Sequence, residues 1–294
     1  MKSNGGKRWF ADAVPVATVV AVLLAIWYIA TVPMNAVLTG PKIAAAGGGL
    51  ANTLAVSWSL DRPVLPAPHQ VLLGFWTSVF MADPTTPRSL LFHVWVTLTS
   101  TLLGFAMGTL LGIGLAIAIV HMKTLQKSLL PWIIASQTIP ILAIAPMIIV
   151  VLGSMGLTGL LPKSIISTYL CFFPVAIGMV KGLSSPEAMQ LDLMHTYNAG
   201  SAQTLFKLRF PASLPFLFTS LKVAVSIALV GAIVGELPTG AQAGIGARLL
   251  TGSYYGQTVQ IWAALLAAAL VAAGLVWLVG AAERMTNWAM GARG

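Results

Sequence analysis

Residues 89–122 read SLLFHVWVTLTSTLLGFAMGTLLGIGLAIAIVHM, without a single Asp, Glu, Lys or Arg. An α-helix needs about 20 apolar residues to cross about 30 Å of hydrocarbon, and this segment is longer than that. Gly104, Gly108 and Gly112 recur within it at four-residue spacing, so three bare backbone patches share one helix face. We therefore predict a membrane-spanning helix that packs closely against a neighbour; the plainer alternative is that glycine is simply frequent in membrane helices.

Comparable apolar segments recur along the rest of the chain. Hydrophobic residues make up 57% of the 294 residues, charged residues only 8%, and the mean hydropathy is +0.89. A soluble domain of this size could not bury so much apolar surface, and the segments are too long for the ten-residue strands of an outer-membrane barrel. We predict an all-α, polytopic membrane helix bundle. Its six transmembrane helices are expected at residues 13–41, 89–122, 128–162, 164–180, 213–235 and 249–282.

One of these segments carries a charge, and one further apolar stretch is not counted as a span. Lys222 lies in the fifth segment, from which its long side chain can snorkel to the headgroups. Residues 43–58 are apolar but short and rich in Gly and Ala. The single Cys171, among apolar residues of the fourth segment, is expected to be a packed thiol.

The distribution of basic residues predicts the orientation of the chain. With an internal N-terminus and six spans, the outer side keeps Lys42, Arg62, Arg88, Lys163 and Arg248. The inner side collects Lys2, Lys7, Arg8, Lys123, Lys127, Lys181, Lys207, Arg209, Lys222, Arg284 and Arg293. Eleven against five follows the positive-inside rule, whereas a crossing at residues 43–58 would leave seven inside and nine outside. The net charge of +9 is thus explained by topology, and no nucleic-acid partner is expected.

The topology divides the chain into three parts. Residues 1–33 are an N-terminal anchor with the first transmembrane helix, because a long apolar run without a small-residue cleavage site favours an anchor over a signal peptide. Residues 34–91 form an external loop, with prolines as breakers and a short interfacial helix at residues 69–80. Residues 92–294 hold the core domain with the other five spans. Both termini are expected on the cytoplasmic side.

A polar island at about residues 184–210 separates two apolar segments, and the chain from residue 184 to 215 reads SSPEAMQLDLMHTYNAGSAQTLFKLRFPASLP. Pro186 and Glu187 suit the start of a short amphipathic helix. Residues 198–200, Asn-Ala-Gly, form a break, because Asn and Gly tolerate left-handed backbone angles. A second short helix is expected at residues 201–209, before Pro211 and Pro215 redirect the chain into the membrane.

The island resembles the cytoplasmic loop of the permease subunits of binding-protein-dependent ABC importers. That loop has the pattern E-A-A-x3-G-x9-I-x-L-P, and here the same spacing is occupied by Asp192, Leu193, Met194, Asn198, Leu208, Phe210 and Pro211. The spacing is kept, whereas only the final proline keeps its identity. The resemblance extends to LPAPHQVL at residues 65–72, LLPWIIASQTIPILAIAPMIIVVLG at 129–153 and PASLPFLFTSLKVAVSIALVGAIVGE at 211–236. These stretches are similar to the branch with sulfonate, taurine, nitrate and pyrimidine-precursor permeases.

The resemblance implies a type I importer fold and a set of partners. A second permease chain, in a homodimer, two cytoplasmic ATPase subunits and an external solute-binding protein would complete the transporter in a bacterial cytoplasmic (inner) membrane. ATP and Mg would bind the ATPase, and no cofactor is expected in this chain. The stretch GELPTGAQAGIGARLL at residues 235–250 most resembles permeases for pyrimidine- or riboflavin-type heterocycles, with sulfonate, taurine or nitrate as the alternatives.

The resemblance also implies roles for individual residues. The loop at residues 184–211 would dock on the ATPase and carry its closing motion to the membrane. The coupling residues would be Asp192, Leu193, Met194, Asn198, Ala199, Gly200, Thr204, Leu205, Phe206 and Pro211. The third and fifth spans would line the translocation path, with Ser136, Gln137, Thr138, Met147, Ser226 and Glu236 as candidates. For Glu236 an ion pair with Arg248 is the preferred interpretation over a gate or a substrate contact.

The sequence has no motif for ATP hydrolysis, metal binding or catalysis. No G-x-x-x-x-G-K-[ST] occurs, and no Cys/His cluster suggests a metal site, so no catalytic residue is assigned. The fragment Gly244-Ile245-Gly246 is interpreted as a turn. A transporter driven by an ion gradient would show internal repeats and ionisable groups in mid-span, and neither is evident. A membrane protein without a transport role is the third alternative, and copurification of an ATPase would argue against both.

Overall fold

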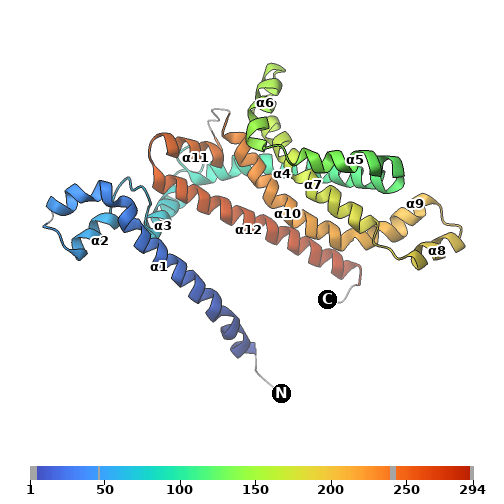
Figure 1. Ribbon diagram of the computed structural model, residues 1–294, viewed down its shortest axis with the longest axis horizontal. Coiled ribbons are helices and arrows are strands. Elements are labelled where there is room, and N and C mark those ends of the chain that lie inside the picture. The colour runs from blue at the N-terminus through green and yellow to red at the C-terminus, as the bar shows by residue number, and fades with distance from the viewer. Residues whose placement is uncertain (1–4, 46, 239–242, 292–294) are drawn as a thin grey trace. The chain divides into compact units, whose positions relative to one another are not determined.

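The computed structural model describes residues 5–45, 47–238 and 243–291, with side chains described from residue 14 onward, and the regular structure in these ranges is helical (Figure 1). This confirms the predicted all-α class. In chain order the elements are α1 (Gly5–Ala45), α2 (Leu50–Trp58), α3 (Pro68–Trp76), the π-helix η1 (Thr77–Met81), α4 (Leu90–His121), α5 (Lys123–Ser136), α6 (Ile141–Ser154), α7 (Leu160–Leu183), α8 (Ala188–Thr196), α9 (Ser201–Thr204), the π-helix η2 (Leu205–Arg209), α10 (Phe210–Glu236), α11 (Ile245–Tyr254) and α12 (Thr258–Ala289).

Five described helical segments are long and apolar enough to cross a membrane. They are Val14–Ala45, Leu90–His121, Leu160–Leu183, Ser201–Glu236 and Thr258–Ala289. A sixth span exists if α5 and α6 count as one, although these helices are bent by 98° at the residues between them. The span predicted over residues 128–162 is therefore a pair of helices that meet at a bend, and not one continuous helix. Pro140, in an extended conformation at the N-cap of α6, has no N–H with which to continue α5.

The last span also begins later than predicted. The chain expected to be helical from residue 249 onward is interrupted after Tyr254, and α12 starts at Thr258. Gly256, between the two helices, has φ of 63°, a left-handed conformation that ends a helix. Four of the basic residues on which the predicted orientation of the chain rests have side chains outside the described part of the structure: Lys2, Lys7, Arg8 and Arg293. Residues 239–242, within the stretch at 235–250, also lie outside it.

The chain divides into two compact units, and the first comprises Met1–Pro84 with Arg248–Leu266. Asn35 is fully buried there: its side-chain amide donates to the Leu65 carbonyl at 2.9 Å, and its oxygen accepts from the Val64 N–H at 2.7 Å. The indole of Trp58 donates to the Thr31 hydroxyl at 3.1 Å. Within residues 34–91, the region expected as an external loop, the end of α1, the helices α2 and α3 and the π-helix η1 are helical. The nine residues of α2 extend about 14 Å, too short for a span.

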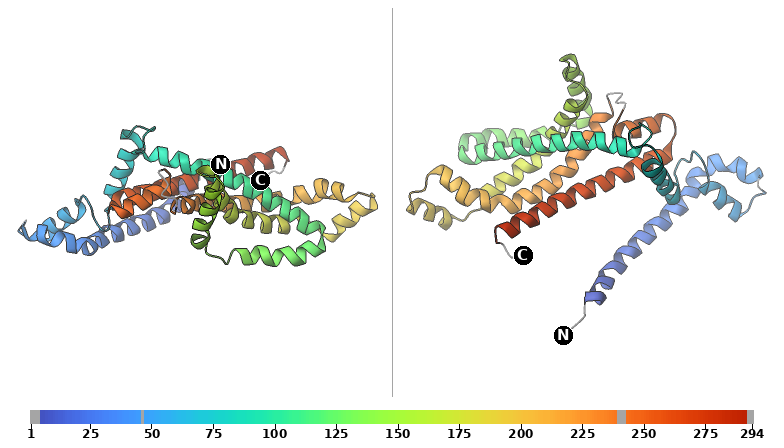
Figure 2. Two further views of the ribbon diagram at one scale, coloured as in Figure 1. Left: turned by 90° about the horizontal axis from the view of Figure 1, so that it is seen from above. Right: turned by 180° about the vertical axis from the view of Figure 1, so that it is seen from behind.

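The second unit comprises Thr85–Ala247 with Ala267–Gly294, and its centre is formed by α4, α7 and α10 (Figure 2). The predicted close packing of the glycine face is confirmed. A Cβ atom built on Gly112 would lie 2.8 Å from the Phe172 carbonyl oxygen of α7, and one on Gly104 would lie 2.7 Å from the Ser164 carbonyl oxygen. Because the helices touch along their backbones, the Thr168 hydroxyl of α7 can donate to the Gly104 carbonyl at 3.1 Å. Cys171 is buried in this packing, as predicted.

An ion pair connects α10 to α12. The ammonium of Lys222 lies 2.5 Å from a carboxylate oxygen of Glu283, and both side chains are partly exposed. Besides the predicted reach of Lys222 to the headgroups, Glu283 gives it a partner, which lowers the cost of a charge within an apolar helix.

Candidate functional site

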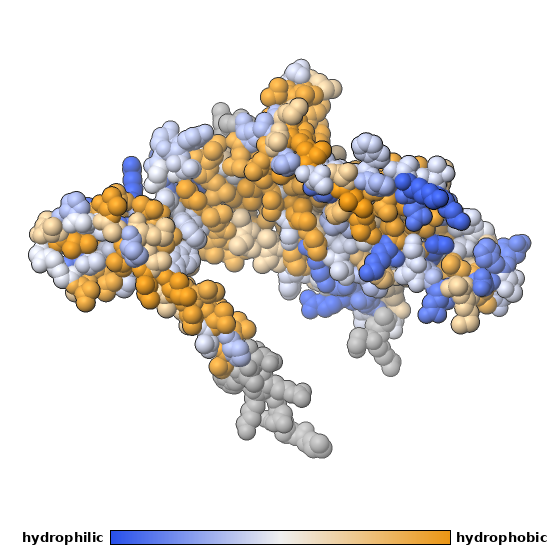
Figure 3. Space-filling view, in the orientation of Figure 1, coloured by the Kyte–Doolittle hydropathy of each residue, from blue (hydrophilic) through white to orange (hydrophobic). Residues whose placement is uncertain are grey.

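The polar island folds as predicted at its start. Pro186 precedes α8, Glu187 is its N-cap, and the Glu187 N–H donates to the side-chain oxygen of Gln190 at 3.1 Å. This bond satisfies a backbone donor that a helix start leaves without an intrahelical partner. No residue of α8 is buried. Figure 3 shows hydrophilic side chains gathering around α8 and α9, in contrast to the apolar face of α6.

The break after α8 is centred on Asn198, which confirms the predicted left-handed turn. Its φ of 51° is the only positive value among the described non-glycine residues. The N–H of Ala199 donates to the Met194 carbonyl at 3.0 Å, and the Asn198 N–H donates to the His195 carbonyl at 2.9 Å. These bonds close the end of α8 in the manner of a helix C-cap, where Asn is second only to Gly.

Substitutions of Asn198 test whether the turn depends on a residue that tolerates positive φ or on the Asn side chain itself. Asn198→Gly should keep the turn, whereas Asn198→Val should destabilise it by about 1–2 kcal/mol, because a β-branched residue is strained at positive φ. Limited proteolysis of the island in the purified chain would measure this. Faster cleavage of Asn198→Val, with Asn198→Gly resembling the wild type, is the expected result, and equal cleavage of the two variants would contradict it.

The prediction of a separate helix followed by a proline break at the membrane entry is wrong. The residues from Ser201 to Glu236 form one continuous helix, in which η2 is a wider turn between α9 and α10. Pro211 lies in the first turn of α10, directly after η2, and does not break the helix there. The guanidinium of Arg209 donates to the Leu183 carbonyl at 2.8 Å and so ties η2 to the end of α7.

The predicted coupling residues fall into two groups by exposure. Leu205 is only 7% exposed and packs among core residues such as Met179 and Leu183. In contrast, Leu193 and Phe206 are 56% and 67% exposed, although both are large and apolar. The remaining residues are exposed or half-buried: Asp192, Met194, Asn198, Ala199, Gly200, Thr204 and Pro211. Leu205 therefore anchors the segment, and the others are accessible to a partner.

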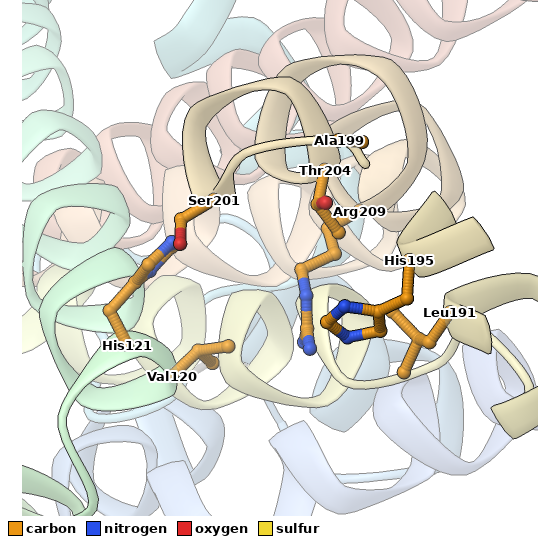
Figure 4. A pocket seen from close by; sticks show the side chains of 8 residues that line it. All are labelled: Val120, His121, Leu191, His195, Ala199, Ser201, Thr204 and Arg209. Carbon is orange, nitrogen blue, oxygen red and sulfur yellow. The ribbon is translucent and has the colours of Figure 1, made fainter. Parts of the chain in front are cut away.

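A cavity of about 230 Å³ lies between this segment and the C-terminal end of α4 (Figure 4). Val120 and His121 line it from α4, and Leu191 and His195 line it from α8. Ala199, Ser201, Thr204 and Arg209 complete its wall.

The structure does not bring the six predicted substrate-path residues together. Ser136, Gln137 and Thr138 lie at the break between α5 and α6, where the Ser136 and Thr138 hydroxyls donate to the carbonyls of Ile133 and Ala135 at 2.7 and 2.8 Å. Met147 is exposed on α6. Ser226 and Glu236 are about 15 Å apart along α10. Their role in the path stays a prediction.

Glu236 is fully buried at the end of α10 and is surrounded by partners from other elements. The Thr97 hydroxyl of α4 donates to both carboxylate oxygens, at 2.9 and 3.0 Å, and the Gly246 N–H donates at 2.8 Å. The ammonium of Lys163, at the start of α7, lies 3.8 Å away. The predicted ion pair with Arg248 is replaced by this pair with Lys163.

The same cluster holds residues 243–246 against the helices. Lys163 donates to the Ala243 carbonyl at 3.3 Å, the Gly244 N–H donates to Nδ1 of His93 at 3.0 Å, and the Ile245 N–H donates to the Thr97 hydroxyl at 2.8 Å. Gly244, with φ of 123°, has no room for a Cβ beside the Glu236 carboxylate. Sequence reasoning missed Lys163 and Thr97, because no spacing or motif links three positions so far apart in the chain.

The chain matches the family model of the "binding-protein-dependent transport system inner membrane component" over residues 108–286. This range contains α5 to α11 and nearly all of α12, hence the whole polar island.

Several curated proteins are similar in sequence. A probable ABC transporter permease protein of Haemophilus influenzae is 33% identical over 66% of this chain and 80% of its own length. The formylaminopyrimidine transport permease protein ThiX of Halalkalibacterium halodurans is 31% identical, over 66% of this chain and 75% of its own. The riboflavin transport system permease protein RibX of Chloroflexus aurantiacus is 30% identical, over 76% and 79%. Relatives of lower identity are named for aliphatic sulfonates and for nitrate.

Proposed function

Because this chain belongs to the family of binding-protein-dependent transport system inner membrane components, we propose that two copies of it form the translocation path for a small heterocycle. The chain is a permease subunit of an ABC importer and is itself non-catalytic. Two ATPase subunits would bind ATP and Mg, and a solute-binding protein would deliver the substrate. The proposed location is a bacterial cytoplasmic membrane with both termini on the cytoplasmic side.

The observation that carries the coupling proposal is the continuous helix from Ser201 to Glu236. Its start, α9 and η2, belongs to the polar island and its remainder is the membrane-spanning α10, so displacement of the island moves α10 as a lever. Exposed Leu193 and Phe206 offer apolar side chains that an ATPase surface would cover. ATP-driven closure would thereby switch the helices between outward- and inward-open states.

The proposed substrate is a pyrimidine- or riboflavin-type heterocycle. Two of the more similar relatives have names that refer to formylaminopyrimidine and riboflavin, which supports this class. Sulfonates, taurine and nitrate are the alternatives, and competition among these compounds for uptake of a labelled heterocycle distinguishes the classes. Inhibition by an unlabelled heterocycle alone is the expected result.

ATP hydrolysis by the complex, purified with its ATPase and binding protein, tests the coupling role. Deletion of residues 192–200, or Asn198→Pro, should abolish substrate-stimulated hydrolysis, because either change removes the turn that presents α8. Ala188→Ser is a matched control on the same exposed helix, outside the deleted segment. Normal stimulation in the deletion variant would refute the coupling assignment. If the wild-type chain retains no ATPase, uptake driven by an ion gradient becomes the function to test.

A further inference from the structure

The cavity beside the end of α4 is lined by basic and hydroxyl-bearing side chains. Arg209, His121, His195 and Ser201 contribute these groups, and none of the eight described residues in its wall is acidic. In Figure 4 the Arg209 guanidinium lies beside the His195 ring, and the Ser201 hydroxyl faces His121. Such a wall attracts an anion and offers it hydrogen-bond donors.

The Arg209 side chain is held in position by a hydrogen bond at one end of its guanidinium. One of its terminal nitrogens donates to the Leu183 carbonyl at 2.8 Å, whereas a guanidinium has five N–H donors in a planar fork. The fork matches two oxygens of a tetrahedral oxyanion. Nδ1 of His121 donates to the Ile117 carbonyl at 2.8 Å, so a ligand can approach Nε2, which accepts a hydrogen bond in the neutral ring and donates one to an anion in the imidazolium form.

We propose that this cavity binds a phosphate group. Its volume of about 230 Å³ is below the roughly 300–1,000 Å³ of sites for drug-sized ligands but is ample for one phosphate. The cavity lies where the apolar α4 ends at His121, just before Lys123 and Lys127. Helix ends with basic residues lie at the depth of phospholipid headgroups, and basic pockets between membrane helices bind such headgroups.

A bound phosphate would connect α4 to the island. His121 belongs to α4, His195 to α8, and Arg209 to η2, which continues into α10. The ligand would therefore hold the island in one position relative to the membrane helices. The binding itself does not depend on the proposed coupling to an ATPase, so the two proposals can fail separately.

Native mass spectrometry of the delipidated full-length chain tests the proposal with two probes. The first arm compares the binding of phosphatidylglycerol with that of a phosphate-free glycolipid that has the same acyl chains. The second arm compares the binding of inorganic phosphate with that of chloride, the control anion, at matched ionic strength. Preferential binding of phosphatidylglycerol identifies a lipid source, and binding of inorganic phosphate identifies a free one. Binding of neither probe would overturn the proposal.

Variants establish whether the bound phosphate occupies this cavity. Arg209→Gln should weaken binding by at least about tenfold through loss of the guanidinium fork. Ser201→Asp should do the same by placing a carboxylate in the cavity, and it leaves the Arg209 bond to Leu183 intact. Ala202→Asp is the matched control, because the neighbouring residue is exposed and lies outside the cavity wall. Equal loss in Ser201→Asp and Ala202→Asp, or no loss in either cavity variant, would show that the cavity is not the site.

Discussion

Gly112→Leu is expected to separate α4 from α7 and to leave little folded chain in the membrane. A Cβ atom at this position would lie 2.8 Å from both the Phe172 carbonyl oxygen and the Cβ of Val175. The oxygen belongs to the helix backbone and cannot move aside as a side chain could. Overpacking costs about 1–3 kcal/mol in ordinary cores, and we expect the upper end here because the helices must separate along their whole contact. Thermal unfolding in detergent would measure the loss.

Gly114→Leu is the matched control for this effect. Gly114 lies on the same helix, and a Cβ built on it meets no other atom within 4 Å. The variant adds the same apolar side chain to a face with open space, so its stability should change by less than about 0.5 kcal/mol. If the two variants unfolded at the same temperature, the close approach of α4 and α7 would not be the reason for the glycine spacing.

Glu236→Ala is expected to be the most damaging change of a single charged residue. The carboxylate is fully buried and accepts hydrogen bonds from Thr97 and Gly246. Its removal leaves the buried ammonium of Lys163 without a counter-ion and the Gly246 N–H without its acceptor. Breaking a buried pair in this way costs about 3–5 kcal/mol. The free energy of unfolding in mixed micelles is the quantity to measure.

Two further variants separate the effect of charge from the effect of lost packing. Glu236→Ala combined with Lys163→Met should recover part of the loss, because the second change removes the unpaired charge. Glu283→Ala breaks the pair with Lys222, whose side chains are 22% and 36% exposed, and should cost less than Glu236→Ala, because the long Lys222 side chain can still snorkel to the headgroups. A cost for Glu236→Ala no greater than that for Glu283→Ala would contradict the role of the buried pair.

Features that depend on neighbouring residues in a single segment were predicted correctly from the sequence. The spacing of Gly104, Gly108 and Gly112 predicted a close helix contact, although it did not identify α7 as the partner. Asn198 was expected in a left-handed turn and has positive φ. The start of α8 after Pro186 follows from the same kind of local preference.

Predictions failed where local signals compete with tertiary packing. Pro211 and Pro215 indicated a break, yet the helix continues because the wide turn of η2 and the bond from Arg209 to Leu183 accommodate it. A long apolar segment at residues 128–162 indicated one span, yet Pro140 divides it into α5 and α6. Proline thus ended a helix at one position and not at another, and the surrounding contacts decided which.

The amino-acid sequence by itself determined that this protein lies in a lipid bilayer and is helical, because the cost of burying backbone and charge in lipid depends on composition along the chain. It also determined the position of the polar island and the turn at Asn198, which depend on neighbouring residues alone. Only the tertiary structure decided which groups meet: Glu236 with Lys163 and Thr97, Lys222 with Glu283, and Arg209 with the cavity beside α4. A pair of charges in lipid gains from any close partner of opposite sign, so helix packing, rather than sequence spacing, selects that partner.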